Sequence, residues 1–134
     1  MNLFYIILTC GIAFLLIRTF MNSRPGLSID EAQAALKSGT AVLIDVRESA
    51  EWTDGVAKDA ALMPLSDLRS NRKIWRPFLE KNKDKLLLLY CHSGARSGMA
   101  ARLLSGEGLN AVNTGGLGTW SQSGWPVAPL RNRR

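Results

Sequence analysis

The chain has 134 residues, which leaves room for one domain beside a short N-terminal segment. Its two cysteines, Cys10 and Cys91, suggest no disulfide framework and argue against a small disulfide-stabilised secreted scaffold. The net charge is +6, but no aromatic-lined groove or known reading motif accompanies it, so nucleic-acid binding is not expected.

The N-terminal segment is apolar. Residues 3–17 form an uncharged run of 15 residues that ends at Arg18. A helix over this run is about 22 Å long, short of the roughly 30 Å hydrocarbon core, but Phe20 and Met21 can extend it. We therefore expect a transmembrane helix over residues 1–21, in contact with the membrane through residues 3–20. The alternative is a cleaved signal peptide on an exported protein, which the missing basic n-region and cleavage site disfavour.

The charges around this segment predict its orientation. Arg18, Arg24 and Lys37 follow the apolar run, whereas only the α-amine precedes it. The positive-inside bias therefore predicts a single-pass protein of the inner (cytoplasmic) membrane whose domain faces the cytoplasm. This reducing compartment would keep Cys91 as a free thiol. Cys10 is interpreted as a passive lipid-facing or packing residue, with palmitoylation as the alternative.

Polar and basic segments flank the domain. Residues 22–26 are predicted to be a linker, and residues 131–134 a basic tail. A second basic stretch runs from Arg69 to Lys85. We interpret these basic residues either as a solvated face or, with an anchor nearby, as a surface attracted to anionic lipid.

Helical and extended patterns alternate after the linker. A capping-box pattern at Ser28 predicts a helix from Ile29 that ends at Gly39. Continuous apolar residues predict a buried strand over 41–44 that ends at Asp45. The expected order continues with a helical turn over residues 48–52 that Gly55 stops, a short strand over 61–63, and a helix through Pro77 to Asn82.

The second half contains the clearest strand, over residues 86–90. A helix is expected over 97–104, with two i,i+4 apolar pairs, and a last short strand over 111–113. The helix pairs are Met99 with Leu103 and Ala100 with Leu104. After the last strand we expect a glycine turn (Gly115, Gly116, Gly118). Trp120 and Trp125 follow it and are interpreted as packing residues. This alternation predicts an α/β domain over residues 27–130, with a small, mostly parallel sheet flanked by helices.

Functional sites of such sheets lie beyond the carboxyl ends of the strands, where Asp45 and Cys91 are expected. The loop after strand 86–90 starts at Cys91 and ends at Arg96, with four residues between them: His92, Ser93, Gly94 and Ala95. Backbone N–H groups in such a turn, together with a helix N-terminus, stabilise a thiolate and make it nucleophilic. The alternative is an inert buried cysteine, which the glycine-containing loop and the following arginine disfavour.

The residues around this thiol have distinct expected roles. Arg96 is expected to supply a cation to sulfur or to an anionic substrate, or else to be an ordinary surface charge. Ser97 is expected to bond the loop or cap the helix, and His92 to point away from the sulfur rather than act as a base. Asp45 and Arg47 are interpreted as a supporting salt-bridge cluster. No metal-ligand spacing or nucleotide loop occurs, so no metal or cofactor is expected.

Together these motifs resemble the rhodanese family of sulfurtransferases. The resemblance covers residues 27–129, and its motifs follow one another in the order usual for the family. They are residues 43–47 with Glu51 and Trp52, residues 63–65, the loop 91–97, and Gly115, Gly116, Trp120, Gly124 and Pro126. One segment departs from the family pattern. Where the family usually has Gly-His-Ile-Pro-Gly-Ala, this chain has Gly-Val-Ala-Lys-Asp-Ala over residues 55–60.

The resemblance implies that Cys91 takes sulfane sulfur from a donor such as thiosulfate, forms a persulfide held by the amides of residues 92–97, and passes the sulfur to a thiol or cyanide-like acceptor. The alternative, from another functional class, is a module that relays sulfur or binds a partner at the membrane with little turnover. Related phosphatases have five residues between Cys and Arg rather than four, so phosphatase activity is disfavoured.

Overall fold

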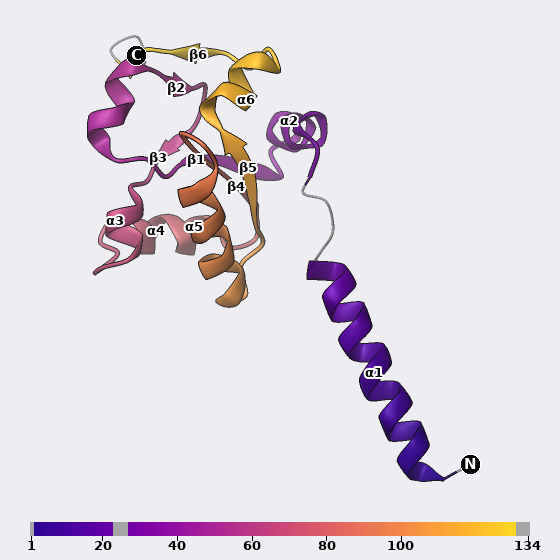
Figure 1. The fold of residues 1–134 in the computed structure, drawn as a ribbon. Helices are drawn as coiled ribbons and strands as arrows, with labels where there is room; N and C mark the ends of the chain where they lie inside the picture. Colours follow the sequence, from indigo (N-terminus) through magenta and orange to yellow (C-terminus); the bar gives the residue numbers. More distant parts are fainter. Residues whose placement is uncertain (1, 23–26, 131–134) are drawn as a thin grey trace.

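The computed structural model describes residues 2–22 and 27–130, with no side-chain description for residues 16–22. The predicted basic tail over residues 131–134 lies outside the described residues, as does the predicted linker apart from Asn22. The described chain contains an N-terminal helix, α1 (Leu3–Asn22), and an α/β domain (Figure 1).

Helix α1 is apolar and exposed along its described side chains. Leu3, Phe4 and Leu15 expose 71%, 69% and 60% of their surface, and neither domain core contains a residue of α1 within the described part of the chain. Among the described helices, none has the length and apolar character that a membrane span requires. The transmembrane anchor predicted for residues 1–21 is therefore not supported by the described part of the chain.

The domain is built on a four-stranded parallel sheet in the order β3-β1-β4-β5. Its strands are β1 (Ala41–Asp45), β3 (Ala61–Leu62), β4 (Leu86–Cys91) and β5 (Ala111–Gly116). Asp45 pairs with Tyr90, so β1 and β4 end side by side. The prediction that Asp45 and Cys91 lie at carboxyl ends of strands is confirmed, and the structure adds that the two strands are neighbours.

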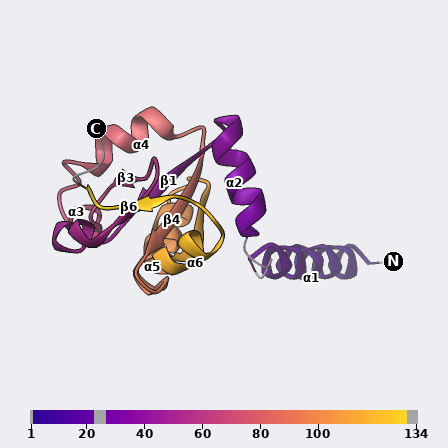
Figure 2. The ribbon, with the colours of Figure 1, turned by 90° about the horizontal axis from the view of Figure 1, so that it is seen from above.

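Helices cover both faces of this sheet (Figure 2). Alternate residues of β4 point to opposite faces, with Leu87 and Leu89 in one core and Leu88 and Tyr90 in the other. Because both faces are buried, the strand appears in the sequence as an uninterrupted apolar run. The first core contains residues of α3 (Leu65–Leu68), α4 (Trp75–Asn82) and α5 (Ala95–Gly106); the second contains residues of α2 (Ile29–Ser38) and α6 (Leu117–Gln122).

Local sequence signals account for several element boundaries. Helix α2 begins at a complete capping box between Ser28 and Glu31 and ends at Gly39, whose left-handed φ of 79° favours glycine. The predicted helical turn is the 3-10 helix η1 (Ser49–Asp54), and it ends at Gly55. The sequence did not predict α3 or the antiparallel pair of β2 (Val56–Ala57) and β6 (Val127–Ala128).

Two sequence predictions are wrong in detail. Met99 and Leu103 are exposed, because the face of α5 that meets the sheet carries Ala100 and Leu104 instead. The predicted glycine turn does not begin at Gly115: residues 115 and 116 are the last two of β5. These glycines extend the strand to the edge where Cys91 lies, since Cys91 pairs with Gly116.

Candidate active site

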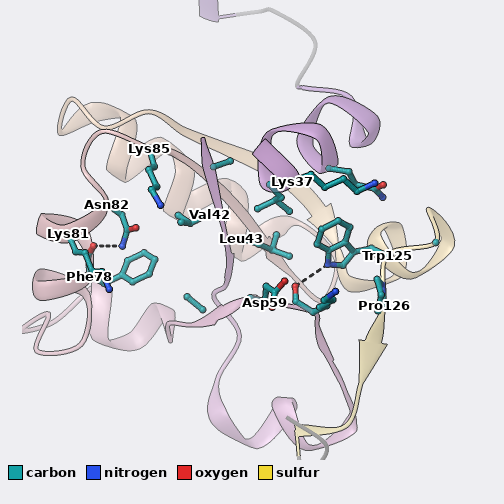
Figure 3. Close-up of a pocket in the computed structure, with 17 residues that line it drawn as sticks. Lys37, Val42, Leu43, Asp59, Phe78, Lys81, Asn82, Lys85, Trp125 and Pro126 are labelled. Carbon is teal, nitrogen blue, oxygen red and sulfur yellow. Dashed lines mark hydrogen bonds between the residues drawn. The ribbon is translucent and has the colours of Figure 1, made fainter. Parts of the chain in front are cut away.

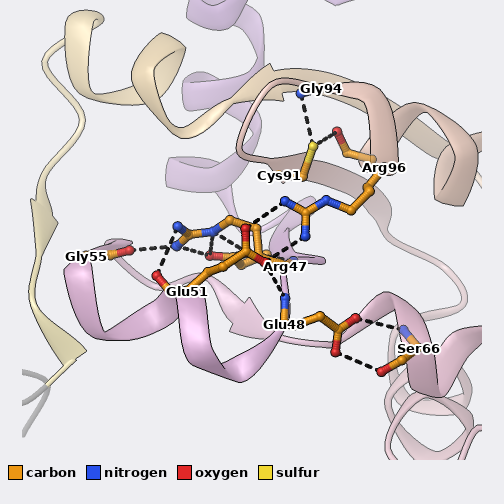
Figure 4. A network of polar contacts seen from close by, with 10 residues as sticks. Arg47, Glu48, Glu51, Gly55, Ser66, Cys91, Gly94 and Arg96 are labelled. Carbon is orange, nitrogen blue, oxygen red and sulfur yellow. Dashed lines mark hydrogen bonds and ion pairs between the residues drawn. The ribbon is translucent and has the colours of Figure 1, made fainter.

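Cys91 is the last residue of β4 and exposes only 1% of its surface. The chain then turns through Gly94, whose φ of 95° is left-handed, and enters α5 at Ala95. This turn directs the Gly94 N–H at the Cys91 sulfur, at 3.0 Å, and the Ser97 hydroxyl lies 3.4 Å from the same atom (Figure 4). The predicted loop therefore forms around the sulfur.

The pKa of the Cys91 thiol is lower than its ordinary value of 9.0. Burial alone would raise it, but hydrogen bonds from the Ser97 hydroxyl and from the backbone N–H groups of Ser97, Gly94 and Ser93 outweigh burial. These donors stabilise the thiolate more than the thiol. The arrangement therefore supplies a nucleophilic sulfur without a neighbouring base.

Replacing Ser97 by alanine is expected to raise the pKa of Cys91, because it removes one donor while the backbone N–H groups remain. The thiolate should then form at higher pH in an ultraviolet titration, measured in a Cys10→Ser background so that Cys91 is the only thiol. Ser105→Ala is the control, since its hydroxyl bonds Ala111 instead. An unchanged titration in Ser97→Ala would show that the hydroxyl does not stabilise the thiolate.

Asn113 joins the loop to the neighbouring strand β5. Its side-chain N–H donates to the Gly94 carbonyl at 3.0 Å, and its Oδ1 accepts from Gly115 N–H at 3.0 Å. The Ser97 hydroxyl lies 2.7 Å from the same Oδ1, so Asn113 and the Cys91 sulfur share its single proton. One amide thus fixes the turn before α5 and the serine beside the sulfur. Sequence reasoning missed Asn113, because nothing local shows that β5 lies against this loop.

The Arg96 side chain forms an ion pair with a carboxylate. Its guanidinium binds Glu51 of η1 through two contacts of 2.7 Å (Figure 4). This pair lowers the pKa of Glu51 to about 2, so the carboxylate stays ionised at neutral pH. The Arg96 guanidinium is therefore held between α5 and η1, and its role as a cation for sulfur or for an anionic substrate stays a prediction. The sequence did not indicate its partner Glu51.

Asp45 and Arg47 form the predicted salt-bridge cluster, and both are buried. Their closest contact is 2.8 Å, and Arg47 also donates to the carbonyls of Glu51 and Gly55. The Tyr90 hydroxyl donates to Asp45 at 2.7 Å. Burial raises the pKa of Tyr90 well above its ordinary value, so this hydroxyl stays protonated. The cluster ties β1, β4 and η1 together beneath the loop.

The other loop residues lie at the surface. His92, Ser93 and Ala95 are exposed, and the expected orientation of His92 away from the sulfur stays a prediction. Two tryptophans pack against each other in the domain. Trp120 is fully buried and contacts Trp125 edge-on, with ring centroids 5.6 Å apart. Among the described residues, no group of three or more His, Cys, Asp and Glu side chains is placed to hold a metal ion.

Comparison with known proteins assigns this architecture to a family. The family model for the rhodanese-like domain matches residues 28–123. A sulfurtransferase of Allochromatium vinosum is 32% identical over 88 residues, which are 64% of this chain and 77% of that protein. An uncharacterised protein of Synechocystis is 34% identical over 93 residues, 68% of this chain, and the match spans about half (49%) of that protein.

A solved structure shows the same fold. The crystal structure of a rhodanese-related protein from Thermoplasma volcanium has 31% sequence identity and a TM-score of 0.63. The match covers 77% of this chain and 96% of that chain. The residues matched by the family model, 28–123, include the Cys91 loop and the carboxyl ends of β1 and β4 beside it. The chain therefore belongs to the rhodanese-like domain family.

Proposed function

We propose that this protein is a sulfurtransferase that carries sulfane sulfur on Cys91. The observation that carries the proposal is the buried Cys91 sulfur, which accepts hydrogen bonds from Gly94 N–H and the Ser97 hydroxyl and has a lowered pKa. Such a site favours a sulfur anion, and a persulfide places its charge on the outer sulfur within the same loop. The sulfurtransferase name of the Allochromatium relative supports the same assignment.

The reaction proceeds in two balanced steps. The Cys91 thiolate attacks the outer sulfur of thiosulfate, the sulfur–sulfur bond of the donor breaks, and sulfite leaves with the bonding electron pair. A thiolate or cyanide acceptor then attacks the outer sulfur of the persulfide, and the Cys91 thiolate is regenerated. No proton has to be transferred to the sulfur in either step, which is consistent with the exposed position of His92. A cytoplasmic location for this reaction stays a prediction from the charges flanking α1.

The test is intact-mass analysis of the full chain, in a Cys10→Ser background, after treatment with thiosulfate. We expect a gain of one sulfur atom, which cyanide removes as thiocyanate, and no gain in the Cys91→Ser variant. An adduct that survives in Cys91→Ser would contradict the proposal. A Cys91 persulfide that forms but is not transferred to small acceptors would support the alternative, a low-turnover sulfur relay.

A further inference from the structure

A large cavity lies away from the Cys91 loop, beside the first half of β1 (Figure 3). Its volume is about 750 Å³, and Cys91 is not among the residues that line it. Strand β3 runs parallel to β1 and begins only beside Ile44, so it does not pair with the first residues of β1. The cavity lies where β3 would run if it began earlier in the chain. We call this cavity, with its floor at residues 41–43, the β1 groove.

The register shows that β1 presents backbone groups to this groove. Leu86 N–H donates to the Thr40 carbonyl on the β4 side at 3.1 Å, whereas Met63 N–H donates to Asp45 on the β3 side at 2.9 Å. Because alternate residues of a parallel strand face opposite neighbours, the N–H and C=O of Ala41 face the β3 side. Within the described chain, no strand partner reaches Ala41 on that side. Ala41 exposes only 5% of its surface, so a further extended segment could pair there only if side chains that line the groove move aside.

The walls of the groove are apolar with a basic rim. Phe78 lines one side and Trp125 the other, and the Trp125 indole N–H is already bonded to the Lys58 carbonyl at 3.0 Å. Four lysines line the groove against a single carboxylate, that of Asp59: Lys37, Lys58, Lys81 and Lys85. In the described part of the chain, the salt bridges found involve none of these four.

We propose that the β1 groove binds an extended acidic segment of a partner protein, which adds to the edge of β1 as a short strand. Residues 41–43 offer about 10 Å of edge at 3.3 Å per residue, enough for about three residues of the partner. Carboxylates on that segment would meet the lysines, and its apolar side chains would meet Phe78 and Trp125. A second copy of this chain is disfavoured, because it would bring four lysines against four more.

A strand edge favours an extended peptide, because its backbone repeats an N–H and a C=O at the spacing of the ladder that Ala41 offers. The groove lies by the first residues of β1, whereas Cys91 lies at the carboxyl end of β4. A partner in the groove would therefore leave the Cys91 loop open. This inference does not depend on the proposed sulfur transfer.

The test uses the full chain and a synthetic heptapeptide that alternates glutamate and valine. We expect the peptide to bind, and to slow hydrogen exchange at the Ala41 amide. The double reversal Lys81→Glu/Lys85→Glu should weaken binding about tenfold or more, since charge pairs steer and hold such a segment. The matched control is Arg69→Glu/Lys73→Glu, two exposed residues outside the groove with the same change in net charge, which should weaken binding much less.

A second control separates pairing from charge. The same peptide with alternate amides N-methylated keeps its carboxylates but cannot form a strand, and it should bind much more weakly. Equal binding of the methylated peptide, equal weakening by the two reversals, or tighter binding of an oligothymidylate than of the peptide would each overturn the proposal. So would the absence of any change at Ala41 with the peptide at millimolar concentration.

Discussion

Replacing Arg47 by methionine is expected to lower the free energy of unfolding by about 3–5 kcal/mol, because it leaves the buried carboxylate of Asp45 without its cation. Asp45 has no exposed surface, and Arg47 satisfies it through Nε and Nη2. The same change removes the bonds that hold the carbonyls of Glu51 and Gly55. Chemical denaturation followed by tryptophan fluorescence measures the loss.

The control is the double variant Asp45→Asn/Arg47→Met, in which no buried charge remains. The asparagine can still accept from the Tyr90 hydroxyl, so the double variant should be more stable than Arg47→Met alone. Exposed Arg102→Met serves as a surface control and should change stability by less than about 0.5 kcal/mol. If Arg47→Met behaves like Arg102→Met, the cluster does not hold this edge of the sheet together.

Most of the fold could be predicted because its elements carry strong local signals. The capping box at Ser28, the left-handed glycine after α2 and the apolar run of β4 each depend on residues close together in the chain. Strands β2 and β6 have two residues each, too few to show an alternating pattern. Their pairing depends on segments about 70 residues apart, which no local pattern reveals.

The two predicted apolar pairs of α5 show why its inward face was misjudged. Met99 and Ala100 are consecutive, so they lie about 100° apart around a helix. The two i,i+4 pairs that begin at these residues therefore cannot both lie at the centre of the face that packs on the sheet. The structure turns Ser97, Ala100 and Leu104 inward and leaves Met99 exposed. Ser97 has to face inward because its hydroxyl reaches Cys91 and Asn113. The contacts that the serine makes at the site therefore determine which face of α5 is buried, and the larger methionine side chain stays at the surface.

The candidate site was predictable only where it is continuous in sequence. The Cys91 loop is one segment, so its N–H donors follow from local spacing. The partner of Arg96, by contrast, lies 45 residues earlier, at Glu51, and Asn113 reaches Gly94 across 19 residues. To predict either contact, one has to know that η1 and β5 lie beside the end of β4. The sequence indicates those elements but not their contacts with the loop.

Gly116→Ala is expected to cost about 100-fold in sulfur transfer, because a misplacement of about 1 Å at a reacting centre has an effect of that size. A Cβ at this position would overlap the carbonyl oxygen of His92 and lie 3.1 Å from its carbonyl carbon. Both obstacles are backbone atoms of the loop, so the loop itself has to move away from β5. Overpacking of this kind also costs about 1–3 kcal/mol of stability.

The matched control for this change is Gly118→Ala, two residues later, where an added Cβ meets nothing within 4 Å. That variant should keep its activity and gain slightly in stability, since alanine favours helix α6 more than glycine does. Thiocyanate formation and chemical denaturation, measured on both variants, separate loop displacement from a general loss of folding. If Gly116→Ala keeps full transfer activity, then close packing of β5 against the loop does not position Cys91, because the loop can shift without consequence for the sulfur.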